Sequence, residues 1–158
     1  MTITRLDRVS IFGDKLSFLI PHEWIEEQED GENYLYHAPN AESGWFRVSL
    51  ITAPNSPERL REHLAERAQQ EHGRLYTAGD NIIVTWERPS EEDGVPIYHF
   101  WWAVGHSHEP ELSREALFTY TVLLDRREDT QTRQTVSLLA DLIANAEFYD
   151  PKEDRAVK

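Results

Sequence analysis

The segment from Ile97 to Val104 constrains the fold of this chain more than any other. It reads IYHFWWAV, and successive side chains of a strand point to opposite faces, so Trp101 and Trp102 would lie on different faces. A strand with one face in water would instead alternate apolar and polar residues. We therefore predict a central strand in a sheet that is covered on both faces.

Further strands are predicted on both sides of this segment. Tight turns are expected at Gly13-Asp14, Gly79-Asp80 and Asp93-Gly94, because these dipeptides suit the short connections of antiparallel hairpins. Parallel strands would need crossovers of about a dozen residues or more. The predicted strands form an N-terminal hairpin over 9–20, the run NYLYHA, a strand over 45–53 and a meander over 74–77, 81–87, 95–104 and 116–124.

Two helices complete the predicted fold. The first begins after Asn55-Ser56, which offers a capping side chain, has Pro57 in its first turn and runs to about Glu71. The second spans about 130–146 and has a broad apolar stripe. We predict an α+β fold with a twisted antiparallel β-sheet, an N-terminal β-hairpin and two main helices packed on one face. Residues 1–148 would form a single domain and 149–158 a flexible charged tail.

Composition excludes several classes of partner and chemistry. The chain has 158 residues and a net charge of −13, which would repel nucleic acid and anionic membranes. It has no cysteine, so disulfide scaffolds and thiolate sites are absent. No apolar run approaches the roughly 20 residues that span a bilayer, and the first residues do not resemble a signal peptide. We expect a cytoplasmic protein without membrane insertion.

Motifs of catalysis are not recognisable in the sequence. Neither a phosphate-binding loop nor a serine nucleophile elbow occurs, and we predict no cofactor, no metal and no catalytic residue. The best metal candidate is His106 with His108, near Glu109 and Glu111, in the predicted loop GHSHEPELSRE. This loop guarantees only two ligands, so a solvated hairpin loop is the simpler interpretation. A small metal-dependent or acid/base enzyme using His106 and His108 remains the alternative.

One face of the predicted sheet is the better candidate for function. With both helices on the other side, alternation assigns to the covered face Phe46, Val48, Ile82, Val84, Trp86, Phe118, Tyr120 and Val122. The pattern does not decide which side chains the central strand adds to the open face. They are either His99 and Trp101 or Tyr98, Phe100 and Trp102. The predicted binding residues on the open face are Trp45, Arg47, Thr85, His99, Trp101, Thr119 and Thr121.

Such a face would be an aromatic platform for a protein partner, because large aromatic side chains supply much of the energy of protein binding. A loop of the chain itself or a second copy in a homodimer could equally cover it.

The order of elements, with the phrase FLIPHEW after the second strand and LLADLIANAEF near the end, resembles the PsbP/DcrB-like superfamily. The likeness covers about 9–148 and includes a Pro-x-x-Trp turn from Pro21 to Trp24. It implies a non-enzymatic role, as in photosystem II accessory subunits, a nuclear-import factor that binds a small GTPase, periplasmic lipoproteins and bacterial chaperones of type VI toxins. The export signal and lipidated cysteine of the lipoproteins are not found here, and no functional residue carries over by position.

These observations together predict a non-catalytic, chaperone-like accessory protein of a bacterial cytoplasm, which binds a protein partner on its open aromatic sheet face.

Overall fold

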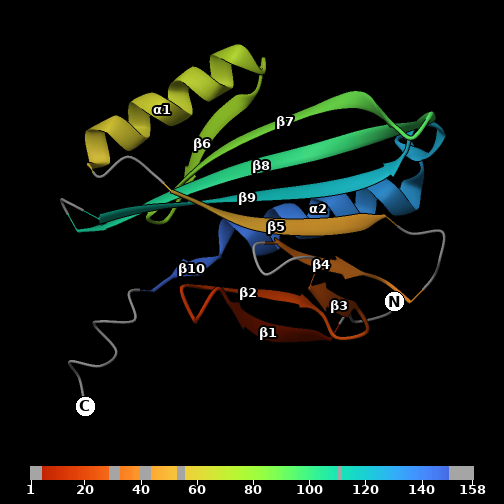
Figure 1. Cartoon of the computed structure of the whole chain (residues 1–158), viewed down its shortest axis with the longest axis horizontal. Coiled ribbons are helices and arrows are strands. Elements are labelled where there is room, and N and C mark those ends of the chain that lie inside the picture. Colours follow the sequence, from red (N-terminus) through yellow and green to blue (C-terminus); the bar gives the residue numbers. More distant parts are fainter. Residues whose placement is uncertain (1–4, 29–32, 40–43, 53–55, 110–111, 150–158) are drawn as a thin grey trace.

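The computed structural model describes residues 5–28, 33–39, 44–52, 56–109 and 112–149 (Figure 1). The predicted α+β class is confirmed. The elements, in chain order, are β1 (Leu6–Ile11), β2 (Leu16–Pro21), β3 (Ile25–Gln28), β4 (Asn33–His37), β5 (Trp45–Thr52), α1 (Pro57–Gln70), β6 (Arg74–Ala78), β7 (Asn81–Glu92), β8 (Val95–Glu109), β9 (Leu112–Leu123), a 3-10 turn (Leu124–Arg126), α2 (Thr130–Ala144) and β10 (Glu147–Phe148).

Most strands belong to one seven-stranded antiparallel sheet in the order β3-β4-β5-β9-β8-β7-β6. The predicted meander from β6 to β9 is confirmed, and β8 lies inside the sheet between β7 and β9. The predicted N-terminal hairpin is also present, as β1 and β2 of a three-stranded sheet that β10 completes. The acidic segment after Trp24 also forms a strand, β3, which the sequence did not predict.

One face of the large sheet, here called the inner face, is covered by α2 and the hairpin. Its side chains alternate with those of the other face, so that Trp102 of β8 is buried here. The core on this side includes Leu16 and Phe18 from β2, Phe46 and Val48 from β5, Ile83 from β7, Phe100, Trp102 and Val104 from β8, Phe118 and Tyr120 from β9, and Leu139 and Ile143 from α2.

The prediction that both helices pack on one face is wrong. Leu60 and Leu64 of α1 lie in a separate cluster with Val84 and Ala103, on the opposite or outer face. Figure 1 shows α1 beside β6 and β7, on the other side of the sheet from the hairpin. Gly105 permits the close approach of α1, since a Cβ there would lie 2.7 Å from a terminal methyl of Leu64.

The prediction assigned the side chains of β7 to the wrong faces. This strand is apolar on both faces, so its sequence does not indicate which side chains face α1 and which face α2 and the hairpin. Its pairing with β8 places Val84 opposite Ala103 and Thr85 opposite Trp102. Ile82, Val84 and Trp86, predicted for the covered face beside Phe46, therefore lie on the outer face. Only the register between strands settles this assignment.

Local signals at the first helix and the first turn act as predicted. The Ser56 hydroxyl accepts a hydrogen bond from the Arg59 amide at 3.1 Å, which caps α1. The Trp24 amide donates to the Pro21 carbonyl at 3.1 Å, and the Trp24 ring stacks on Tyr120 with centroids 6.4 Å apart. The Pro-x-x-Trp turn thus anchors the end of β2 to the core.

The C-terminal end of the described chain returns to the hairpin, where the Tyr149 amide donates to the Lys15 carbonyl at 2.8 Å. The rest of the tail predicted at 149–158 lies outside the described residues. None of the helices in the described ranges is long and apolar enough to cross a membrane.

Candidate binding face of the sheet

The outer face of the sheet is covered by α1 over only part of its width, because α1 packs mainly against β6, β7 and β8. Toward β5 the face opens, and Trp45 is 44% exposed. We call this part the open face and define it by the outer-face side chains that extend from β8 across β9 and β5 to β4: Leu35, Trp45, Arg47, His99, Trp101, Thr119 and Thr121.

The structure brings the predicted binding residues together in two cross-strand rows. His99 lies opposite Thr121, which lies opposite Trp45. In the next row, Trp101 lies opposite Thr119, which lies opposite Arg47, but the Thr119 side chain is buried. Of the two sets of side chains that β8 could add to the open face, the structure therefore places His99 and Trp101 there.

Thr85 is the one predicted binding residue that does not belong to the open face. It pairs with Trp102 on the inner face, and its hydroxyl donates to the Trp101 carbonyl oxygen at 3.0 Å. The prediction failed for the reason given above for β7, since a shift of one residue moves a side chain to the other side of the sheet.

A pocket of about 270 Å³ occupies the outer end of the open face. Its lining residues are Leu35, Trp45, Arg47, Glu92, His99 and Thr121. Sequence reasoning missed Leu35 and Glu92. The alternation of NYLYH could have indicated Leu35, whereas Glu92 reaches the pocket only because β7 extends as far as the Asp93-Gly94 turn. Both residues of that turn have positive φ, 52° and 80°, as a two-residue hairpin connection requires.

The pocket contains two neutral polar residues, His99 and Thr121, and two charged residues of opposite sign, Arg47 and Glu92. His99 Nδ1 lies 2.7 Å from Thr121 Oγ1. Burial lowers the pKa of His99, although the Glu92 carboxylate opposes this effect, so the imidazole is neutral at pH 7. The formal charges are then the Arg47 guanidinium and the Glu92 carboxylate, which line the pocket together with the exposed Trp45.

Trp45 is held in place by a ring contact with His37 of β4 and by the close packing of the preceding Gly44 on β9. The His37 ring lies 4.4 Å from the Trp45 ring, and His37 Nδ1 donates to the Ala38 carbonyl at 2.9 Å. Gly44, which precedes Trp45, touches the neighbouring strand so closely that a Cβ would lie 2.5 Å from the Thr121 carbonyl oxygen. The backbone that presents Trp45 is therefore fixed against β9.

Trp101 contributes to packing more than to exposed surface. Its ring stacks on Trp86 at 5.7 Å with an interplanar angle of 6°, and the Arg67 guanidinium of α1 lies 5.6 Å from the Trp86 ring. The two indole N–H groups have no hydrogen-bond partner in the part of the chain that the structure describes. This stack forms the boundary between the region under α1 and the open face.

The predicted loop of His106 and His108 is wrong, because β8 continues to Glu109 and β9 begins at Leu112. His106 Nδ1 lies 3.1 Å from Asn81 Oδ1, and its ring stacks on Phe148 at 5.6 Å. The side chains of 108 and 109, and residue 111, lie outside what is described. Within the described residues, no group of three or more His, Asp or Glu side chains could hold a metal ion. The enzymatic alternative stays a prediction.

Sequence reasoning also missed a buried carboxylate beneath α1. The Glu115 side chain of β9 is 0% exposed, and its Oε1 lies 3.0 Å from His63 Nε2. Burial raises the pKa of Glu115, while the nearby His63 and Arg67 oppose the shift. His63 and Arg67 of α1 thus offset only part of the cost of burying this carboxylate, whose oxygens have no hydrogen-bond partner among the described residues.

Comparison with known proteins shows a shared fold. No protein-family model matches the chain, and no curated protein sequence matches it significantly. A Bacteroides thetaiotaomicron crystal structure aligns with a TM-score of 0.61 and 16% identity over 92% of this chain, which spans only 49% of that one. The Saccharomyces cerevisiae Ran-binding protein Mog1p aligns with a TM-score of 0.59 and 10% identity over 95% of this chain and 98% of its own. The chain therefore has a fold similar to that of Mog1p.

Proposed function

We propose that this chain is a non-catalytic, chaperone-like accessory protein that holds a segment of a protein partner on its open face. The observation that carries this proposal is the pocket in which Trp45, 44% exposed, stands beside Arg47 and Glu92. A large exposed aromatic next to fixed charges is typical of the centre of a protein interface. His99 and Thr121 add hydrogen-bonding groups to the lining of the pocket.

The fold is compatible with this role. Mog1p, which has a similar fold, is a Ran-binding protein, although a shared fold alone does not determine function. The anchored turn from Pro21 to Trp24 supports membership of the PsbP/DcrB-like superfamily, which we propose on the same grounds. The absence of an enzymatic activity and the cytoplasmic location are part of the proposal.

Substitution of Trp45 by alanine tests the proposal. Affinity capture with the purified protein, followed by reconstitution with the purified captured partner, gives a dissociation constant for each variant. We expect Trp45→Ala to weaken the complex about thirtyfold, because removal of a central aromatic costs about 2 kcal/mol. The melting temperature should change little, since the side chain is half exposed.

Leu75→Ala is the matched control, because Leu75 is 45% exposed and lies in the separate groove between α1 and β6. Equal loss of binding in both variants, or unchanged binding in Trp45→Ala, would contradict the proposal. If the partner is a second copy of the chain, sedimentation will show a dimer that Trp45→Ala converts to a monomer, and the partner-binding role is then refuted.

A further inference from the structure

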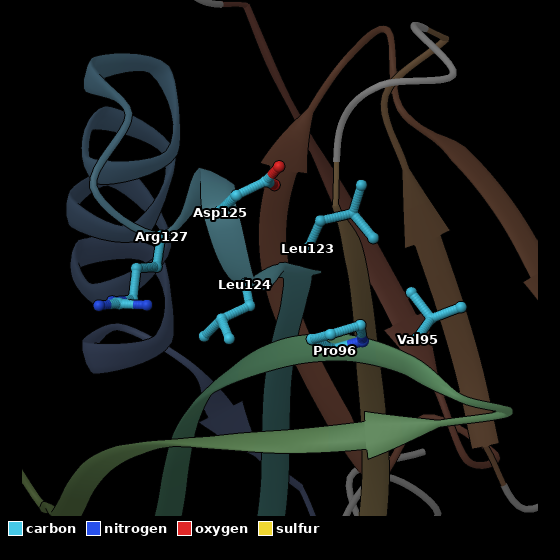
Figure 2. A pocket seen from close by; sticks show the side chains of 6 residues that line it. All are labelled: Val95, Pro96, Leu123, Leu124, Asp125 and Arg127. Carbon is cyan, nitrogen blue, oxygen red and sulfur yellow. The ribbon is translucent and has the colours of Figure 1, made fainter.

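A second pocket, of about 450 Å³, lies at the corner of the sheet where β8 begins and β9 ends. We call it the corner pocket; its lining residues are Val95, Pro96, Leu123, Leu124, Asp125 and Arg127 (Figure 2). Val95 and Leu123 are each 45% exposed, so the apolar wall is open to solvent. Exposed apolar side chains that share one hollow mark a binding site more often than single ones do.

The corner pocket continues the open face. Leu123 follows Thr121 by two residues on the same side of β9, at a distance of about 7 Å for an extended strand. On the other wall, Val95 pairs with Glu92 across the hairpin turn. Thr121 and Glu92 both line the pocket beside Trp45. The two pockets are therefore neighbours along β9 and at the β7–β8 turn.

Acidic residues lie at both pockets: Glu92 lines the pocket beside Trp45, Asp93 follows it in the hairpin turn, and Asp125 lines the corner pocket. Glu92, Asp93 and Asp125 are exposed and form no ion pair with any other residue that the structure describes. Within the described ranges no Lys or Arg is paired with these three carboxylates, so they remain available to a cationic group of a partner.

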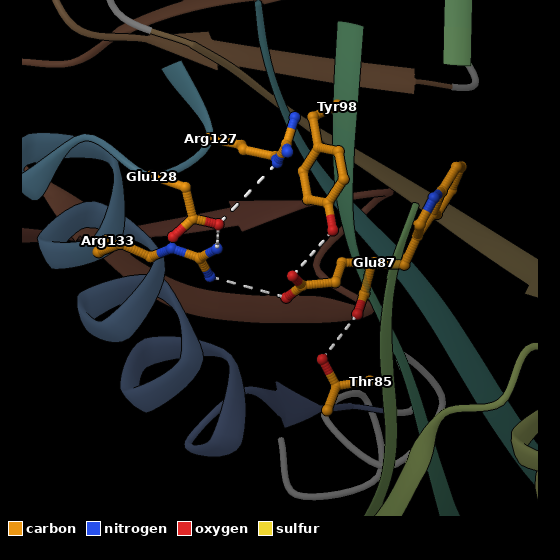
Figure 3. A network of polar contacts seen from close by, with 7 residues as sticks. Thr85, Glu87, Tyr98, Arg127, Glu128 and Arg133 are labelled. Carbon is orange, nitrogen blue, oxygen red and sulfur yellow. Dashed lines mark hydrogen bonds and ion pairs between the residues drawn. The ribbon is translucent and has the colours of Figure 1, made fainter. Parts of the chain in front are cut away.

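Arg127 lines the corner pocket itself and also contacts residues outside it, and Arg133 of α2 is likewise paired with residues outside the pocket. Arg127 lies 5.7 Å from the Tyr98 ring and 3.9 Å from Glu128, and Arg133 lies 2.8 Å from Glu128 and 3.8 Å from Glu87 (Figure 3). These contacts tie the start of α2 to β7 and β8. The corner pocket therefore combines an apolar wall with Asp125, for which the described residues supply no ion pair, and with Arg127, whose charge is shared with Glu128.

We propose that the corner pocket receives an apolar side chain of a basic, extended partner segment, whose flanking Lys or Arg residues meet Glu92, Asp93 and Asp125. This inference rests on the proposed function and names the chemistry of the partner. A second copy of the chain fits less well, because each copy carries a net charge of −13 and would bring like charges together.

A short peptide of the proposed chemistry tests the corner pocket directly. We would titrate the ¹⁵N-labelled protein with acetyl-Gly-Lys-Leu-Lys-Gly-amide and follow amide chemical shifts. The largest shifts are expected at Val95, Leu123 and Asp125. Replacement of both lysines by glutamate, or of the leucine by serine, should weaken binding about tenfold or more. No binding, or equal binding of the lysine and glutamate peptides, would overturn the inference.

Variants of the protein separate the two features of the pocket. Leu123→Ser should weaken the lysine peptide about tenfold, whereas Leu75→Ser, equally exposed but remote, should leave it unchanged. The pair Asp93→Asn and Asp125→Asn removes two of the three acidic charges, and Asn tolerates the positive φ of 52° at position 93. Asp141→Asn, at an exposed position of α2, controls for charge. Equal affinities in variants and controls would refute the proposal.

Failure of this inference is distinguishable from failure of the proposed function. If Trp45→Ala weakens the natural partner but Leu123→Ser does not, the open face binds the partner and the corner pocket does not. If the lysine peptide binds at Leu123 while the natural partner is insensitive to Trp45→Ala, the corner pocket stands and the proposed function of the open face is wrong.

Discussion

Glu115 shows at the scale of one residue how this structure tolerates a charge in its interior. The carboxylate is removed from water, which costs several kcal/mol for an isolated ion. His63 of α1, 3.0 Å away, offsets part of this cost. Because burial is the largest effect on the Glu115 pKa, and raises it, the ionised form remains unfavourable in the folded protein.

The raised pKa of Glu115 predicts a pH dependence of stability. The contribution of Glu115 to the free energy of unfolding is fully present below its pKa in the unfolded chain, about 4.5. It is lost as the pH rises through the higher pKa of the folded protein. Glu115→Gln removes the ionisation. We expect the variant to be more stable than the parent at pH 8 by about 1 kcal/mol, with a smaller loss of stability between pH 4.5 and 8. Urea denaturation across this range measures both.

Exposed Glu62 on the same helix provides the control, since Glu62→Gln changes the net charge equally without touching the interior. A Glu115→Gln variant that is less stable than the parent at pH 8 would show that attraction to His63 outweighs the cost of burial.

At the scale of elements, the two helices differ in how firmly they hold the sheet. α2 packs into the large inner core together with the hairpin, and Arg133 adds an ion pair to Glu87. α1 rests on a small cluster, with Leu60 and Leu64 against Val84 and Ala103. Because its contacts are few and lie mostly at one edge of the sheet, α1 is expected to open locally before the rest unfolds.

Leu64→Ala tests this difference between the helices. The variant leaves a cavity under α1 and should lower the free energy of unfolding by about 3 kcal/mol. Hydrogen exchange should accelerate in α1 far more than in α2. Glu66→Ala, exposed on the same helix, should change neither. Equal acceleration in both helices would mean that α1 and the inner core unfold as one unit.

The whole molecule is a three-layer arrangement with one incomplete layer. The inner face is covered by α2 and the hairpin over its core, while α1 leaves the outer face open at Trp45. Glu92 lines the pocket beside Trp45 and Asp125 lines the corner pocket. A partner that is basic and apolar satisfies both features, whereas the same charge disfavours self-association.

The overall charge predicts how the partner complex responds to salt. If the partner segment is basic, raising NaCl from 50 to 500 mM should weaken the complex about tenfold, mainly by slowing association, because screening acts on long-range attraction. The Leu123→Ser complex should show the same proportional loss, since it retains the charges. Stopped-flow kinetics measure the association rate, and an affinity independent of salt would exclude a basic partner.

The amino-acid sequence by itself determined the features that depend on neighbours along the chain. The apolar run around Trp101 and Trp102 indicated a strand buried on both sides, Asp93-Gly94 a tight hairpin, and Ser56-Pro57 the start of α1. These signals are local, because φ preferences, caps and alternation act within a few residues.

Only the tertiary structure decided which face of the sheet each side chain and each helix occupies. Only the pairing of β7 with β8 placed Thr85 on the inner face, and only the docking of α1 brought His63 to Glu115. A strand that is apolar on both faces carries no mark of which face meets which helix, because that choice depends on contacts between residues far apart in the chain. The same non-local packing left uncovered the part of the outer face where we place binding.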